Sequence, residues 1–389
     1  MSSPAGPPTS PSSSAQVDQS PPTLLPVPPA GTACGSSVPP GSEPSTSTPS
    51  GPTRSPIWSR PGVSGPVSAV AWSPDGSLLG STPGDSGGTD HTARLWTAAG
   101  LAVATLKGHS GLIHCVAWSM DSQLVASASQ DGSVRLWDRK GRLVRVLAGS
   151  DPVFSLAWSP DDTILAVGAI HMPGPTPWPG VITLWRPDGT RLATVGTELT
   201  GGKFLNLGWS SDGTLLAAGA VDYAEWRADG SSVAVLRNGG TPAWAMAWSP
   251  DSRSLALGDE NGSLVVVSTT GTELGSAQFQ GDVNALSYAP DGQALAVGTN
   301  GRIRFVKAAD PTKAIWNLET ADEGHVAWSP DGQRLAIAVT NGLAILSAEG
   351  SLVATLTGCA GSSVAFAWSG SNLAAATAEG RLCVWKGPR

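Results

Sequence analysis

The sequence predicts an all-β protein folded as a single closed β-propeller of eight blades, each made of four antiparallel strands. The chain of 389 residues contains 48 glycines, and only 14% of its residues are charged. It has 16 tryptophans against two tyrosines and five phenylalanines, which indicates one tryptophan position copied many times. A unit of about forty residues repeats along the chain, and a repeat of this period is typical of propeller blades.

Residues 1–52 are predicted to form a disordered tail that precedes the propeller of residues 53–389. Proline, serine, threonine and glycine dominate the tail, and such a segment buries too little apolar surface to offset its ordering entropy. Residues 23–34 faintly resemble the end of a lipoprotein signal with Cys34 as the lipidated residue, although prolines interrupt the apolar part. We expect a cytoplasmic protein, with export or lipid anchoring through Cys34 as the alternative.

Each repeat begins with an alternating strand that ends in an aromatic residue followed by a tight turn. In Ser-Pro-Asp-Gly, proline presets φ, the aspartate caps the turn and glycine adopts a positive φ. The residue before the aromatic is always small, which predicts close packing between sheets. The eight aromatic residues are Trp72, Trp118, Trp158, Trp209, Trp248, Tyr288, Trp328 and Trp368.

Three further strands complete each repeat, as residues 124–128, 134–137 and 143–147 illustrate in the second copy. Turns that contain glycine separate these strands, as expected for antiparallel neighbours. Residues 81–92 and 171–180 are insertions between the second and third strands of blades one and three.

The second copy contains Gly108-His109, the strand that ends at Trp118, Ser127, Asp131-Gly132 and Trp137-Asp138. In these residues it resembles a WD repeat. The resemblance implies a structural chain of hydrogen bonds that joins His109, Ser127, Asp131 and Trp137, and such a chain satisfies buried polar groups. The other copies are degenerate, and those of blades five to seven lack the tryptophan of the third strand.

Ring closure is predicted to use the segment before the first repeat. The last copy ends at its third strand, so residues 54–59 are expected to pair with it as the fourth strand and to remove the free edges. A ring of seven blades with one unpaired copy is the alternative.

Composition and motifs exclude several classes of function. The net charge of −7 is spread without a basic stripe, which argues against nucleic acid as a partner. The sequence contains no recognisable catalytic, cofactor-binding or metal-binding constellation, and no apolar run long enough to span a membrane. The four cysteines have no paired spacing, and we interpret them as small buried apolar residues.

We therefore expect a monomeric, non-enzymatic scaffold that binds a protein or peptide, without a cofactor, on the propeller face that carries the two insertions. A proline-stiffened loop that presents an aromatic side chain loses little entropy on binding. The alternative is that these aromatic residues plug the ring, or that a small ligand or a hydrolytic site uses the channel near His114, Glu323 and His325. The candidate binding residues are His114, Phe154, His171, Trp178 and Trp244.

Overall fold

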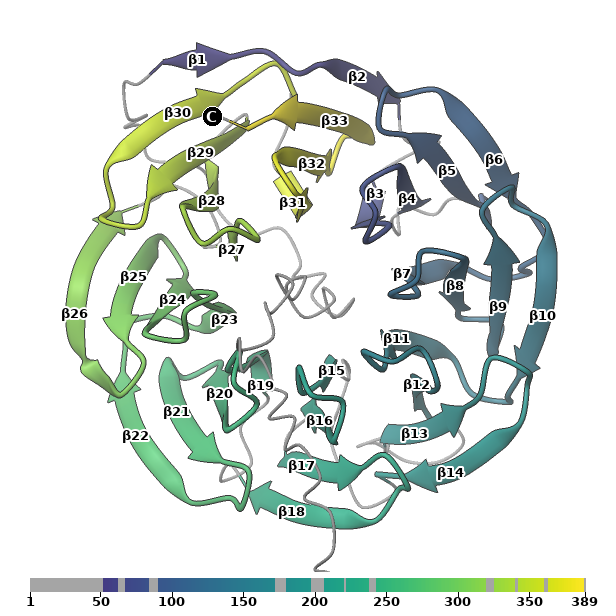
Figure 1. Ribbon diagram of the computed structural model, residues 1–389, viewed down its shortest axis with the longest axis horizontal. Helices are drawn as coiled ribbons and strands as arrows, with labels where there is room; N and C mark the ends of the chain where they lie inside the picture. The colour runs from purple at the N-terminus through teal and green to yellow at the C-terminus, as the bar shows by residue number, and fades with distance from the viewer. Residues whose placement is uncertain are drawn as a thin grey trace, which may run out of the picture.

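The computed structural model describes residues 52–61, 67–83, 90–171, 180–196, 206–219, 222–237, 243–319, 325–339, 342–359 and 363–387. In these residues the strands form eight sheets that stand in a ring around a central axis (Figure 1). The predicted eight-bladed propeller is confirmed, and the seven-bladed alternative is wrong. The predicted tail lies outside the described residues, except for its last residue, Pro52.

The strands follow one another from the innermost to the outermost position of each blade. Blades one to four consist of β3 (Val67–Trp72), β4 (Leu78–Pro83), β5 (Ala93–Thr97) and β6 (Ala102–Leu106); β7 (Ile113–Trp118), β8 (Leu124–Ser129), β9 (Ser133–Asp138) and β10 (Leu143–Ala148); β11 (Val153–Trp158), β12 (Leu165–Ile170), β13 (Gly180–Trp185) and β14 (Arg191–Val195); and β15 (Asn206–Trp209), β16 (Leu215–Gly219), β17 (Asp222–Arg227) and β18 (Ser232–Arg237). Blades five to eight consist of β19 (Ala243–Trp248), β20 (Ser254–Asp259), β21 (Ser263–Ser268) and β22 (Glu273–Gln278); β23 (Val283–Tyr288), β24 (Ala294–Thr299), β25 (Arg302–Lys307) and β26 (Asp310–Glu319); β27 (Val326–Trp328), β28 (Arg334–Val339), β29 (Gly342–Ser347) and β30 (Leu352–Leu356); and β31 (Ser363–Ser369), β32 (Asn372–Thr377) and β33 (Arg381–Lys386).

The turn after each first strand has the chemistry that its sequence predicts. In blade one the Ser73 hydroxyl donates to Asp75 Oδ1 at 2.6 Å, and the same oxygen accepts the Ser77 backbone N–H at 3.0 Å. Gly76 has a φ of 69°, a conformation that glycine adopts without steric cost. These hydrogen bonds stabilise the turn that joins β3 to β4.

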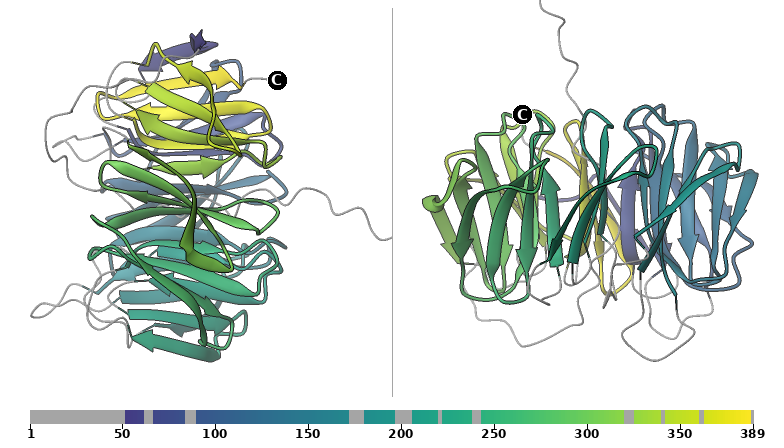
Figure 2. Two further views of the ribbon diagram at one scale, coloured as in Figure 1. Left: turned by 90° about the vertical axis from the view of Figure 1, so that its left-hand side faces the viewer. Right: turned by 90° about the horizontal axis from the view of Figure 1, so that it is seen from below.

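The hydrophobic core lies between neighbouring blades. One cluster joins Ala71 and Leu95 of blade one to Val116 and Trp118 of blade two, and similar clusters fill the other seams. Small residues on one blade meet bulky residues on the next, as the sequence pattern predicts. Figure 2 shows how this stacking sets the blades side by side, with their strands running between the two faces of the ring.

The residues before the first repeat divide between two blades. Strand β2 (Trp58–Pro61) pairs antiparallel with β33 as the fourth strand of blade eight, and Ser59 lies opposite Cys383. Strand β1 (Thr53–Arg54) instead pairs parallel with β30, so blade seven has a fifth strand. The ring is thus closed by residues from both ends of the propeller.

The connections of the ring lie on two faces. One face carries the connections between second and third strands, such as 130–132, and those between successive blades, such as 107–112 and 149–152. We call it the insertion face, because the two insertions, residues 81–92 and 171–180, include the connections of this kind in blades one and three.

Candidate functional site

Two of the candidate aromatic residues meet at the inner edge of the ring. His114 is the second residue of β7 and Phe154 is the second residue of β11, so both lie at the insertion-face end of innermost strands. Their rings are stacked, with centroids 4.5 Å apart and planes tilted by 24°. Both side chains are half-buried, which leaves part of the stack accessible.

Trp244 occupies the equivalent position on blade five and stands apart from this stack. It is half-buried, and its buried indole nitrogen has no hydrogen-bond partner among the described residues. The ring contacts described in the structure do not join it to His114 or Phe154. The structure therefore gives one aromatic pair on blades two and three and a separate tryptophan on blade five.

The equivalent positions of blades one and six are polar. The Ser68 hydroxyl lies 2.8 Å from Thr82 Oγ1 and also donates to the Pro83 carbonyl at 2.8 Å. The Asn284 side-chain amide donates to Asn300 Oδ1 at 2.8 Å. The inner rim of the insertion face thus changes from aromatic to polar around the ring.

His171 is the first residue of the blade-three insertion, on the same blade as Phe154. Its Nδ1 is 2.9 Å from Asp151 Oδ1, an atom of the connection between blades two and three, and 45% of its side chain is exposed. Trp178 lies outside the described residues, as do residues 84–89 of the blade-one insertion and the rest of residues 172–179 in blade three.

The hydrogen-bonded chain of blade two has a well-defined geometry. His109 Nδ1 lies 2.9 Å from Asp131 Oδ2 and its Nε2 lies 2.8 Å from Ser127 Oγ, which also accepts the Trp137 indole N–H at 2.9 Å. Burial lowers the pKa of His109. Burial acts to raise the pKa of Asp131, but hydrogen bonds from Ser133, Ser110 and His109 outweigh it and hold that pKa below its usual value. The chain links the connection before β7 to β8, to the turn that follows β8 and to β9.

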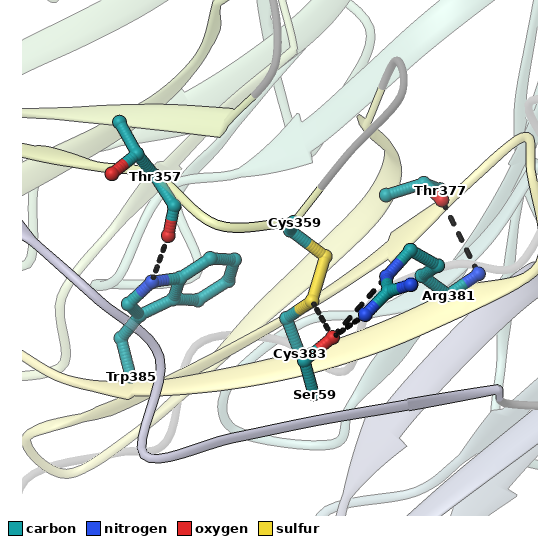
Figure 3. The surroundings of a disulfide bond; sticks show 7 residues. All are labelled: Ser59, Thr357, Cys359, Thr377, Arg381, Cys383 and Trp385. Carbon is teal, nitrogen blue, oxygen red and sulfur yellow. Dashed lines mark hydrogen bonds between the residues drawn. A yellow bond between two sulfur atoms is a disulfide. The ribbon is translucent and has the colours of Figure 1, made fainter.

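A disulfide bond joins Cys359 to Cys383 (Figure 3). The interpretation of the cysteines as independent buried apolar residues is therefore wrong for these two, and it is also wrong for Cys115, which is disulfide-bonded as well. The pairing was not evident from the sequence, because it depends on how the connection between blades seven and eight folds back over β33.

Glu225 is the second feature that the sequence did not reveal. It lies on β17 at the seam between blades four and five, where only 1% of it is exposed, and neither carboxyl oxygen has a partner among the described residues. Burial raises its pKa to about 7. The sequence contained a signal for this residue. A leucine precedes the third-strand tryptophan in blades one to three (Leu95, Leu136 and Leu184), whereas Glu225 precedes Trp226 in blade four.

Two classes of site have no support in the described part of the chain. It holds no group of three or more His, Cys, Asp or Glu side chains that could bind a metal ion. It also contains no helix that is long and apolar enough to cross a membrane.

Comparison with known proteins shows that parts of the chain are similar to a family of repeats. A model described as "WD domain, G-beta repeat" matches residues 54–97, 100–138, 141–170 and 272–306. The chain is 31% identical over 173 residues to the intraflagellar transport protein 80 homolog of Mus musculus, a match that covers 41% of this chain and 20% of the mouse protein. It is 38% identical over 109 residues to THO complex subunit 3 of Arabidopsis thaliana, covering 26% of this chain and 33% of that protein.

Solved structures share the whole ring. Sqt1 from Chaetomium thermophilum superposes with a TM-score of 0.73 and 18% identity, over 86% of this chain and 99% of Sqt1. Sqt1 has also been solved bound to the N-terminus of the ribosomal protein L10, with a TM-score of 0.73 and 19% identity over 85% of this chain and 99% of that chain. The computationally designed Ika8 protein gives a TM-score of 0.71 at 18% identity, over 85% of this chain and 99% of Ika8. The chain is an eight-bladed β-propeller in which four segments match the WD repeat.

Proposed function

We propose that this propeller is a non-enzymatic, monomeric scaffold that binds a protein or peptide on its insertion face. The observation that carries the proposal is the His114–Phe154 stack, which presents two partly exposed rings at the inner edge of that face. Aromatic side chains held in place by neighbours lose little entropy on binding and often dominate binding energy.

The sequence pattern supports a role beyond packing for this pair. Positions that hold blades together repeat around the ring, such as the first-strand aromatic residue and the small residue before it. The position of His114 and Phe154 is instead occupied by Ser68 in blade one, Trp244 in blade five and Asn284 in blade six. A position that changes from blade to blade is free of the packing constraint, so its residues are available for recognition.

The surroundings of the pair extend the proposed surface. His171 and Asp151 lie on the same face, and we assign Trp178 of the blade-three insertion and Trp244 of blade five to the same binding surface. The protein Sqt1, which shares this fold, binds an N-terminal peptide of a ribosomal protein, so the architecture is suited to a peptide ligand.

The test is quantitative binding to a partner identified in its native host. Partners captured from lysate on the wild-type protein are identified, and the bound region is prepared as a peptide for calorimetry. Phe154→Ala should raise the Kd for this peptide about 30-fold, a loss of about 2 kcal/mol of binding free energy at a hot spot. His114→Ala, Trp178→Ala and Trp244→Ala define the extent of the surface.

The matched control is Leu274→Ala, which removes an apolar side chain that is 55% exposed on the outer wall of blade five. This variant should bind with unchanged affinity. If Phe154→Ala and Leu274→Ala bind the peptide equally well, the insertion face is not the binding surface. Light scattering of the purified protein then checks the proposed monomeric state.

A further inference from the structure

In three blades, one position anchors the connection from the preceding blade. It lies four residues before the first strand, and it is His109 in blade two, Phe279 in blade six and Cys359 in blade eight. The same connection is held to its blade by different chemistry each time. His109 joins the hydrogen-bonded chain, and Arg304 of β25 places its guanidinium carbon 5.1 Å from the centroid of the Phe279 ring.

In blade eight this anchor is covalent. Cys359 follows β30, and its sulfur is bonded to that of Cys383, the third residue of β33. The hydrogen-bonded chain of blade two cannot form here, because Ala375 stands where blade two has Ser127. The Trp385 indole N–H therefore donates to the Thr357 carbonyl at 3.2 Å instead.

The disulfide lies directly under the strand that closes the ring. Ser59 of β2 is opposite Cys383 in the strand register, and its hydroxyl oxygen is 3.3 Å from the Cys383 sulfur. Arg381 holds the same hydroxyl through Nη2 at 2.7 Å, as Figure 3 shows. Both cysteines are fully buried, and the closing strand β2 contacts the disulfide through Ser59.

We propose that Cys359 and Cys383 form a redox clasp that locks the closure of the propeller. The clasp forms when one cysteine thiolate attacks the disulfide of a small-molecule or protein oxidant and expels one of its thiolates. The second cysteine thiolate then attacks the cysteine sulfur of the mixed disulfide and expels the other oxidant thiolate. The two cysteines are oxidised and release two protons, and the oxidant disulfide is reduced to two thiols.

Such a bond persists in an oxidising compartment, so the clasp favours export of this protein over a cytoplasmic location. Docking of β2 then buries the bond and shields it from reductants. This prediction is independent of the partner-binding proposal, because it concerns the seam between blades seven and eight and the closing strand.

The first test compares the oxidised and reduced full-length protein. Cys34→Ser and Cys115→Ala are introduced together, so that only Cys359 and Cys383 can respond to a phosphine reductant. Reduction should lower Tm by about 5 °C, the size expected for a bond that closes a loop of this length. It should also speed amide exchange in β2 at least tenfold, while exchange in β20 and β21 of blade five stays unchanged.

The matched control adds Cys359→Ala and Cys383→Ala to the same background. This variant should melt near the reduced protein and show no response to reductant, and glutathione disulfide should restore the higher Tm only in the chain that keeps both cysteines. Equal Tm and equal β2 exchange in the two redox states would overturn the clasp.

The second test asks whether the bond exists in the native host. Protein trapped by acid and alkylated before reduction should yield the cross-linked pair of peptides that contain Cys359 and Cys383. Recovery of both cysteines as alkylated thiols would contradict the proposal even if the purified protein can be oxidised.

Discussion

The first-strand tryptophans hold neighbouring blades together through single hydrogen bonds. The indole N–H of Trp118 donates to the Ala71 carbonyl at 3.2 Å, and that of Trp72 donates to the Ala367 carbonyl at 3.1 Å across the ring closure. The acceptor is the carbonyl of the small residue that precedes the aromatic in the preceding blade. Trp328 departs from this pattern, because its buried indole nitrogen has no partner among the described residues.

Replacing these tryptophans by phenylalanine should separate the hydrogen bond from the packing. We expect Trp118→Phe to lower the free energy of unfolding by about 1 kcal/mol more than Trp328→Phe, the net value of one buried hydrogen bond. Both changes remove the same volume, so Trp328→Phe is the control. Urea unfolding measures the difference, and equal losses would show that the bond to Ala71 contributes nothing.

Glu225 is a residue-scale source of pH dependence. Its pKa in the folded protein is about 7, raised by burial from the ordinary value of 4.5. The folded state therefore holds this proton more tightly than the unfolded state does. The resulting stability is fully present below about pH 4.5 and is lost as the pH rises through about 7, by about 3 kcal/mol in total.

Removing the ionisable group should remove this loss. We expect the free energy of unfolding of Glu225→Gln to change less between pH 5 and pH 8 than that of the wild type. We expect Glu225→Leu to be more stable than the wild type at pH 8. Glu319→Gln, at a carboxylate whose side chain is 82% exposed, is the control and should keep the wild-type pH profile. If the free energy of unfolding of Glu225→Gln changes with pH in parallel with that of the wild type, ionisation of Glu225 does not cause the loss.

At the scale of elements, the turn between the third and fourth strands of one blade packs on the outer strand of the preceding blade. A Cβ added to Gly100 would lie 2.6 Å from the Trp58 ring, and one added to Gly350 would lie 2.8 Å from the Trp316 ring. The indole N–H of Trp58 donates to the Ala98 carbonyl at 2.9 Å, and that of Trp316 donates to the Ala348 carbonyl at 3.3 Å. Trp58 of blade eight and Trp316 of blade six therefore make equivalent contacts with the turn of the following blade.

This contact predicts a large penalty for a single methyl group. Gly100→Ala should lower the free energy of unfolding by about 3 kcal/mol, from positive φ and from overlap with the Trp58 ring. Gly370→Ala is the matched control, because Gly370 has a φ of 52° but no atom within 4 Å of its added Cβ. It should cost only about 1 kcal/mol. Similar losses of free energy of unfolding in both variants would show that the turn moves away from the Trp58 ring without a loss of stability.

At the scale of the whole molecule, blade eight differs from the others because its outer strand comes from the opposite end of the propeller. Strand β2 is held to β33 by strand pairing, and Trp58 of β2 is buried in the cluster that joins blades eight and one. In the other blades a turn joins the third strand to the fourth.

Comparing equivalent tryptophans should show whether the pairing of β2 with β33 opens first. Trp58→Ala and Trp316→Ala each remove an indole ring and its hydrogen bond, and each should cost about 3 kcal/mol or more. Only Trp58→Ala should speed amide exchange locally in β33 and β3, because a turn keeps β26 joined to β25 in the other variant. Local opening of the same extent beside Trp316 would refute a special role for the closing strand.

The repeat, the eight blades and the hydrogen-bonded chain from His109 to Trp137 were predictable from the sequence. Each depends on residues within one unit of about forty, where strand alternation and turn chemistry are local properties. The neighbourhood of His114 and Phe154 was also predictable, because equivalent positions on adjacent blades must lie side by side.

The tertiary structure alone decided the features that link separate units. It paired Cys359 with Cys383 and divided residues 53–61 between two blades. These outcomes depend on which side chains of different blades come into contact when the ring closes. Periodicity along the chain specifies each blade, but the closed ring determines what each blade touches.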